Sequence, residues 1–174
     1  MPTYNISYAV SGVAPVECTN RLLNFWRIRW DFEPVVDEEH HNVELTSFKE
    51  YQLDHKPTIE EVKQVILDWY NSKIDEEIVS GFSYNGMPVW LSSENQFNYK
   101  AAYDLAIQTN GATLPVTFKF GTNYDPVYKT FTTKEELMDF YISALSYVTE
   151  VLNRGWIEKD SFDWSPYEEA LSKL

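Results

Sequence analysis

His55 directly follows Asp54, and such a pair could act as an oriented general base in a hydrolytic reaction. A base of this kind needs a nucleophile beside it. Neither Cys18 nor any serine lies in a Gly-x-Ser-x-Gly elbow that would single it out. The pair also precedes Pro57 and a predicted helix start, where Asp-His commonly forms a turn with a capping role. We therefore favour the turn and keep a hydrolase around His55 as the weaker alternative.

Two adjacent histidines, His40 and His41, follow the acidic residues Asp37, Glu38 and Glu39 and could help to hold a divalent metal ion. Adjacent residues rarely converge on one ion without a second segment, so a solvated acidic loop explains them better. The sequence has no helical His-x-x-x-His pair, no cysteine pair and no Asp-x-Asp-x-Asp-Gly calcium loop. Its six glycines form no phosphate-binding loop. We therefore expect no metal, no cofactor and no catalytic residue, and hence a protein that is not an enzyme.

Aromatic residues are abundant, with six Trp, twelve Tyr and ten Phe. Such rings either fill a core or form a contact surface. Trp26 and Trp30 fall on one face of a predicted strand and could stack on sugar rings, but a buried sheet face requires the same pattern and is favoured. The candidate contacts for a partner protein or a glycan are Trp26, Trp30, Trp90, Trp156 and Trp164.

The net charge is −13, with 27 acidic and 14 basic residues. Such a chain repels nucleic acid and anionic membrane surfaces, and no run of Lys and Arg offers a track for phosphates. No apolar segment is long enough to cross a membrane, and the N-terminal residues lack the features of a signal peptide. The single Cys18 excludes an internal disulfide. We expect neither nucleic acid nor membrane as a partner, and no secretion by a signal peptide.

Alternating residues predict strands in the first part of the chain at 3–10, 22–32 and 43–51. In the first strand, the half-buried face is expected to carry Tyr4, Ile6, Tyr8 and Val10. In the second, the corresponding face carries Trp26, Ile28, Trp30 and Phe32. The acidic segment 31–41 contains Pro34 and is predicted to be an exposed loop. A capping box at Thr58–Glu61 then predicts a helix over 59–72.

The second part reads as strand, strand, helix, twice in succession. Asn85-Gly86 predicts a tight type I′ hairpin turn, and Ser93–Gln96 resembles a capping box that starts a helix. That helix is expected to bury Phe97, Ala101, Ala102, Leu105 and Ala106 and to end at Asn110-Gly111. Strands follow at 114–120 and 127–131. A last helix begins near Thr132 and is expected to end at Asn153-Arg154-Gly155, with a packed stripe of Leu137, Phe140/Tyr141, Ala144/Leu145, Val148 and Val151/Leu152.

These elements predict an α+β fold: antiparallel strands and one helix at the N-terminus, followed by a ββαββα domain. The expected divisions are an N-terminal module over 1–75, the ββαββα domain over 76–155 and a C-terminal tail over 156–174. The tail contains Trp164 and Pro166, and we expect it either to dock through its aromatic rings or to be partly mobile.

Two motifs in the second part carry a resemblance. The first is Gly81-Phe82 with Tyr84–Val89, followed by Gln96 and Ala101-Ala102; the second is Thr132–Leu137 at the start of the long helix. Through these, residues 76–155 resemble a domain of unknown function found in bacteriophage and prophage proteins, often encoded beside tail or tail-fibre genes. The form most similar to this chain is that of prophages of gut Bacteroidota. The resemblance implies a role in the virion or its assembly and assigns no catalytic residue.

We therefore expect a non-enzymatic phage or prophage structural protein, a tail- or virion-associated module that mediates protein–protein assembly. Its expected partners are other phage structural proteins or further copies of itself, and its expected location is the virion or the host bacterial cytoplasm. The alternative is a carbohydrate-binding module for attachment to the host surface. That alternative requires Trp26, Trp30 or Trp90 to be accessible to solvent.

Overall fold

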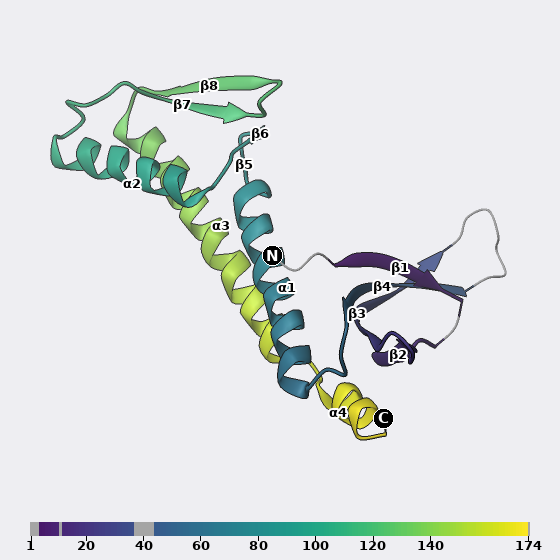
Figure 1. The fold of residues 1–174 in the computed structure, drawn as a ribbon. Coiled ribbons are helices and arrows are strands. Elements are labelled where there is room, and N and C mark those ends of the chain that lie inside the picture. Colours follow the sequence, from purple (N-terminus) through teal and green to yellow (C-terminus); the bar gives the residue numbers. More distant parts are fainter. Residues whose placement is uncertain (1–3, 11, 37–43, 174) are drawn as a thin grey trace. The chain divides into compact units, whose positions relative to one another are not determined.

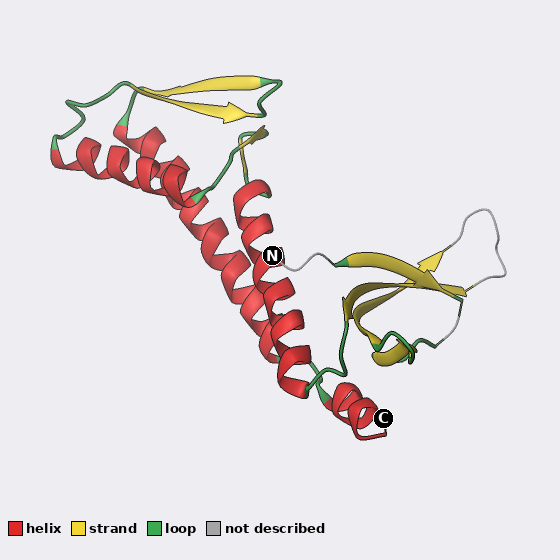
Figure 2. Ribbon diagram, viewed as in Figure 1, coloured by secondary structure: helices red, strands yellow, loops and turns green. Residues whose placement is uncertain are grey.

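The computed structural model describes residues 4–10, 12–36 and 44–173, which form two compact units. We call Met1–Trp69 with Ser161–Leu174 the sheet unit, and Tyr70–Asp160 the helical unit. Both units contain helices and strands, and the α+β fold class expected from the sequence is confirmed (Figures 1 and 2). The part of the predicted acidic loop that contains His40 and His41 lies outside the described residues.

The sheet unit is built on four antiparallel strands in the order β1-β4-β3-β2. Their bounds are Asn5–Ala9 (β1), Val16–Asn20 (β2), Phe25–Val36 (β3) and Glu44–Leu53 (β4). Trp26, Ile28 and Trp30 are only 7%, 0% and 1% exposed, so the predicted inner face of the second strand is confirmed up to Trp30. The ring of Trp30 also meets that of Trp69 at 6.2 Å.

A β-bulge in β3 reverses the face on which Phe32 lies. Asp31 has a positive φ of 57°, and the register with β4 shifts between Trp30 and Glu33. Because a bulge inserts one extra residue, the alternation changes phase after it. Phe32 consequently lies 5.7 Å from Phe48 and is 42% exposed. The prediction of an exposed loop beginning at Asp31 was wrong, since β3 continues to Val36.

The apolar face of β1 is largely exposed, contrary to the half-buried face predicted for it. Ile6, Tyr8 and Val10 are 55%, 62% and 65% exposed. β1 is an edge strand paired only with β4, and its other face approaches the sheet's buried polar groups. There the Ser7 hydroxyl donates to Glu50 Oε1 at 3.4 Å. The alternation was recognised correctly, but it does not reveal which face is covered.

The C-terminal residues of the chain are docked in the sheet unit. Helix α4 (Ser165–Lys173) follows Asp163, whose carboxylate accepts from the Ser165 amide at 3.0 Å. Tyr167 is 3% exposed, and its hydroxyl donates to the Arg29 carbonyl at 2.9 Å. The Trp164 ring packs against that of Phe162 in a tilted arrangement, with the ring centroids 4.5 Å apart. Of the two expectations for the tail at 156–174, docking through aromatic rings describes residues 161–173, whereas residues 156–160 continue α3 and Trp156 is 48% exposed.

Helix α1 (Ile59–Ser80) starts at the capping box that the sequence predicts. The Thr58 hydroxyl accepts from the Glu61 amide at 3.2 Å, and the Glu61 carboxylate accepts from the Thr58 amide at 2.8 Å. The helix does not end at residue 72. The segment that follows contains neither Gly nor Pro before Gly81, and Ile74 and Ile78 extend its buried side.

The helical unit continues with the short hairpin β5 (Ser83–Tyr84) and β6 (Met87–Pro88), then helix α2 (Ser93–Gln108). Asn85 and Gly86 have φ of 50° and 77°, as the predicted turn requires. The cap of α2 is one residue earlier than predicted, because the Asn95 amide bonds to the Ser92 hydroxyl at 3.3 Å. The buried residues of α2 are Tyr99 and Ala106, whereas the predicted core residues Phe97 and Leu105 are exposed.

A second hairpin, β7 (Val116–Gly121) and β8 (Pro126–Phe131), precedes the long helix α3 (Lys134–Asp160). The core of this unit is strongly aromatic and includes Tyr84, Tyr99, Phe120, Phe131 and Phe140. The Thr133 hydroxyl caps α3 by accepting from the Glu136 amide at 3.2 Å.

Gly155 does not end α3, as the sequence had suggested, but lies inside it and is buried. A Cβ at Gly155 would lie 2.3 Å from Ile74 Cγ1, so the glycine permits the second half of α1 to pack closely alongside α3 (Figure 1).

Candidate functional site: the outer stripe of helix α3

The five tryptophans proposed as contacts differ in exposure. Trp26 and Trp30 are buried in the sheet unit and present no ring to solvent, which removes both from the set of contact residues. Trp90 and Trp156 are 56% and 48% exposed. Trp164 is partly buried, with Lys63 Nζ 5.7 Å from its ring centroid. Only Trp90 and Trp156 therefore remain as large, open aromatic surfaces, and both belong to the helical unit.

His55 is held between two carboxylates at the start of α1. Its Nδ1 lies 2.9 Å from Asp54 Oδ1 and its Nε2 lies 2.9 Å from Glu61 Oε1. The hydrogen bond to Asp54, followed by the one to Glu61, raises the pKa of His55 above its usual value. Both ring nitrogens are thus already bonded, and the imidazolium form suits them best. This arrangement fastens the turn before α1 and leaves neither nitrogen to accept a proton from a nucleophile.

The described part of the chain offers no evident metal centre. Across residues 4–10, 12–36 and 44–173, no group of three or more His, Cys, Asp and Glu side chains is arranged to hold a metal ion. His55 illustrates the reason, since its two nitrogens point to carboxylates on opposite sides of the ring and do not converge with them on one point. Among the same residues, no helix combines the length and hydrophobicity needed to cross a membrane.

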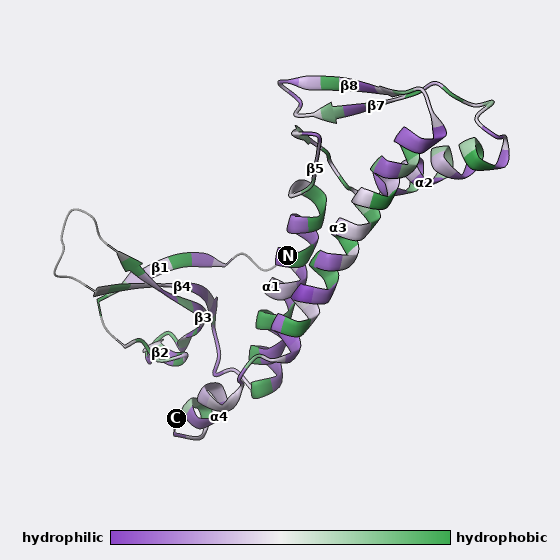
Figure 3. Cartoon of the chain, turned by 180° about the vertical axis from the view of Figure 1, so that it is seen from behind, coloured by the Kyte–Doolittle hydropathy of each residue, from purple (hydrophilic) through white to green (hydrophobic). Residues whose placement is uncertain are grey.

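The most distinctive surface of the helical unit is an apolar stripe along the outside of α3. We call these residues the outer stripe: Met138, Ile142, Leu145, Leu152 and Trp156, together with Thr149, which lies between Leu145 and Leu152. Counted with Thr149, successive residues are alternately four and three positions apart. Four of them are 38%, 51%, 52% and 48% exposed (Met138, Ile142, Leu145 and Trp156). Hydrophobic segments accordingly recur along the ribbon of α3 (Figure 3).

The opposite side of α3 explains why the outer stripe faces solvent. Leu137, Phe140, Ala144 and Val151 are at most 5% exposed and form the inner side of the helix in the core. Gly155 continues that inner side against Ile74. The core therefore uses one face of α3 completely. On the outer stripe, Leu152 is partly buried and packs against this core, whereas Met138, Ile142, Leu145 and Trp156 remain largely exposed at the spacing of a helix–helix seam.

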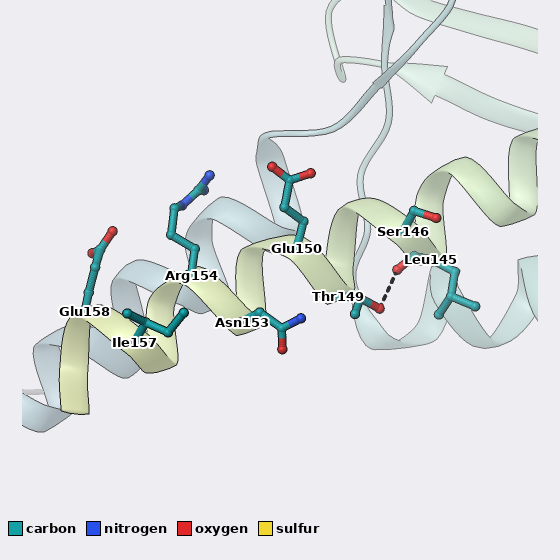
Figure 4. A pocket seen from close by; sticks show the side chains of 8 residues that line it. All are labelled: Leu145, Ser146, Thr149, Glu150, Asn153, Arg154, Ile157 and Glu158. Atoms are coloured by element: carbon teal, nitrogen blue, oxygen red, sulfur yellow. Dashed lines mark hydrogen bonds between the residues drawn. The ribbon is translucent and has the colours of Figure 1, made fainter. Parts of the chain in front are cut away.

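Two hollows flank the outer stripe at Leu145. One is a shallow, open stretch of surface lined entirely by α3, as Figure 4 shows with Leu145, Ser146, Thr149, Glu150, Asn153, Arg154, Ile157 and Glu158. The Thr149 hydroxyl there turns back to the Leu145 carbonyl at 2.9 Å, which presents its methyl group outward. The other hollow, of about 250 Å³, lies between α2 and α3 and includes Phe97, Tyr141, Leu145 and Val148.

The rim of the outer stripe carries charges of both signs. Glu150 and Asp160 are exposed beside it, and Asp139 accepts the Tyr84 hydroxyl at 2.9 Å. Among the basic groups, Arg154 pairs with Glu77, Lys73 with Glu158, and Lys100 with Asp104, while Lys159 donates to the Asn71 side chain at 3.2 Å. A ligand for this surface therefore meets apolar side chains along the middle and mixed charges along the edge.

Sequence reasoning did not identify the outer stripe as a surface. It assigned Leu145 and Leu152 to the packed stripe of α3, which is confirmed for Leu152 but wrong for Leu145, and it named neither Met138 nor Ile142. The signal was nevertheless present, because the alternation of four and three runs unbroken from Met138 to Trp156. A helix with two apolar stripes can bury both only against two partners. In α3 the core of the helical unit covers the inner side, and the outer stripe is left mostly exposed.

Comparisons of this chain with family models, with curated proteins and with solved structures found no match.

Proposed function

We propose that the chain is a non-enzymatic assembly protein whose helical unit binds a helix of another protein along the outer stripe. The observation that carries this proposal is the exposed run from Met138 to Trp156 at alternating spacings of four and three. This spacing is that of knobs-into-holes packing between helices. The hollow between α2 and α3 beside Leu145 provides a hole into which a side chain of a partner helix can insert.

The resemblance of residues 76–155 to a domain of phage tail-associated proteins supports a setting in a virion or in its assembly. Capped helices, an aromatic core and a net charge of −13 suit a rigid building block that binds only selected partners. In this proposal the partner is another phage structural protein, and the protein resides in the virion or in the host cytoplasm.

The net charge of −13 favours a partner of opposite charge over a second copy of the chain, which would carry the same net charge. A helix with one apolar face flanked by Lys or Arg would satisfy both the apolar middle of the surface and the net charge of the chain. We therefore propose a basic amphipathic helix as the occupant and treat self-association as an alternative outcome of the test.

The exposed area is large enough to matter for binding. Ile142 and Leu145 keep 51% and 52% of their surface exposed. Complete burial of such a side chain stabilises by roughly 1.5–3 kcal/mol, so burying the remaining half adds about 1 kcal/mol for each. An Asp at either position would remove this gain and place a desolvated carboxylate in the seam.

The test combines photocrosslinking with a pair of charge variants. A photoreactive phenylalanine at Ile142 is introduced into the full chain in cells that produce phage particles, and crosslinked proteins are identified by mass spectrometry. We expect one phage structural protein, crosslinked through a basic amphipathic helix. The double variant Ile142→Asp/Leu145→Asp should bind the purified partner at least about a hundredfold more weakly.

A matched control adds the same charge elsewhere on the helical unit. Asn98→Asp/Gln108→Asp changes two exposed positions of α2 and should leave affinity for the partner within about twofold of wild type. Circular dichroism of both double variants checks that they fold. Crosslinks only to a second copy of the chain, or equal binding by both double variants, would contradict the proposal.

A further inference from the structure

A second surface of the helical unit combines open aromatic rings with polar groups. A cleft of about 650 Å³ lies beside the turn between β7 and β8. Its lining comes from the end of α1, the segment before α2, and the β7–β8 hairpin: Ser80, Pro88, Val89, Trp90, Asn95, Lys119, Phe120, Gly121, Thr122, Asn123 and Tyr124. The volume lies within the range of small-molecule sites, roughly 300–1,000 Å³.

One ring of the cleft, Tyr124, is held out by an internally bonded turn. The Thr122 hydroxyl accepts from the amides of Tyr124 at 3.3 Å and Asp125 at 3.0 Å, and the Thr122 amide donates to the Asp125 carbonyl at 3.1 Å. Gly121, with φ of 79°, brings the chain so near that a Cβ would lie 2.2 Å from that carbonyl. Tyr124 is nevertheless 101% exposed, so its ring contributes nothing to the core. The turn is held by its own hydrogen bonds.

The other ring, Trp90, is fixed by its backbone on both sides. The amide of Val89 donates to the Phe82 carbonyl at 2.9 Å, and the amide of Leu91 donates to the Val79 carbonyl at 2.9 Å. The carbonyl of Trp90 itself accepts from the Asn95 side chain at 2.8 Å. Its indole still remains 56% exposed. The hydrogen bonds therefore position a large ring that the fold leaves open to solvent.

We propose that this cleft binds a saccharide, with Trp90 and Tyr124 stacking on the apolar faces of pyranose rings. Sugars present both C–H faces and hydroxyl groups, and the cleft offers partners for each. Asn123 can donate and accept, the Thr122 hydroxyl hydrogen is available to donate, and the Lys119 ammonium has no ion-pair partner among the described residues. The net charge of −13 disfavours a nucleic acid as the occupant.

This site is separate from the outer stripe and would give the chain a second type of ligand. None of the cleft residues belongs to α3, and none lines the two hollows beside Leu145. A protein with both surfaces could attach an assembled particle to a bacterial surface polysaccharide. Loss of one kind of binding should leave the other unchanged, so the two proposals can fail independently.

The test exposes the full chain to an array of bacterial capsular and lipopolysaccharide glycans, followed by titration of the best ligand by NMR. We expect binding with chemical-shift changes at the Trp90 indole and at the amides of residues 121–124. Trp90→Ala and Tyr124→Ala should each weaken binding by about tenfold or more, which corresponds to roughly 1.4 kcal/mol.

Tyr8→Ala is the matched control, since it removes an aromatic ring that is 62% exposed and lies outside the cleft, and it should leave glycan binding unchanged. The proposal is overturned if no glycan binds and free glucose, galactose, mannose and N-acetylglucosamine at 50 mM (about the level that detects weak sugar sites) shift none of the cleft resonances. Binding that Tyr8→Ala weakens as much as Tyr124→Ala also overturns it.

Discussion

Replacing Gly155 with Ala tests whether α1 and α3 are in close contact in the helical unit. The added Cβ would lie 2.3 Å from Ile74 Cγ1 and 2.5 Å from Ile74 Cδ1. Carbon atoms in contact prefer roughly 3.5–4.0 Å, so the two positions must separate by about 1.2–1.7 Å. Ile74 is 6% exposed and has little free space into which to move.

Two opposing terms decide the result for Gly155→Ala. Overpacking of a filled core typically costs about 1–3 kcal/mol. Ala in place of Gly in a helix interior stabilises by about 1 kcal/mol. We therefore expect the free energy of unfolding to fall by about 1 kcal/mol overall.

Urea denaturation followed by circular dichroism and by tryptophan fluorescence measures this change, and coincidence of the two curves checks for two-state unfolding. In an Ile74→Ala background, which itself costs about 2–5 kcal/mol, the obstructing atoms are gone. There Gly155→Ala should become stabilising by about 1 kcal/mol. Asn153→Ala, at an exposed position of the same helix, controls for helix propensity alone.

The sign of the Gly155→Ala effect decides between two structures. Stabilisation by about 1 kcal/mol in the wild-type background would show an ordinary helix position with free space around it. Equal effects in the wild-type and Ile74→Ala backgrounds would show no contact between the two residues. Either result would refute the close packing of α3 on α1.

Two further predictions concern helix starts. Ser92→Ala should destabilise the protein by about 1 kcal/mol because it removes the hydroxyl that accepts the Asn95 amide, whereas Ser93→Ala should change stability by less than about 0.5 kcal/mol; urea denaturation of both tests which serine is the cap. His55 should titrate above its ordinary pKa of 6.5 in NMR spectra. Because its pKa is raised in the folded state, its contribution is complete below the unfolded value and is lost as pH rises through the folded value, and His55→Gln should abolish that pH dependence.

Features decided by local chemistry could be predicted from the sequence. Asn85-Gly86 forms the expected turn because few residue pairs tolerate two positive φ values, and Thr58 and Glu61 form the expected box because their side chains reach only neighbouring amides. The cap of α2 shows the limit of this reasoning. Ser92 and Ser93 are chemically equivalent, and only the path of the chain after Leu91 selects between them.

Features decided by a distant segment could not be predicted. Gly155 follows Asn153 and Arg154, a combination that also ends helices, and only Ile74 on another helix shows that the glycine serves close packing. Phe32 changes face because Asp31 introduces a bulge that the alternation of residues does not show. The same difficulty affected β1, whose apolar face is recognisable in the sequence although the fold leaves it open.

For the outer stripe too, the sequence shows a local pattern, the apolar periodicity, whereas the burial of each side chain depends on distant segments. Ala144 and Leu145 are neighbours in one predicted stripe, yet Ala144 is 5% exposed and Leu145 is 52% exposed. Periodicity identifies the side chains that need burial, but it does not say whether this chain or another protein provides it. In α3 the core accounts for Leu137, Phe140 and Ala144, and the outer stripe remains. A regular apolar seam is costly to leave in water, and for this reason we propose that a basic helix of a partner buries it.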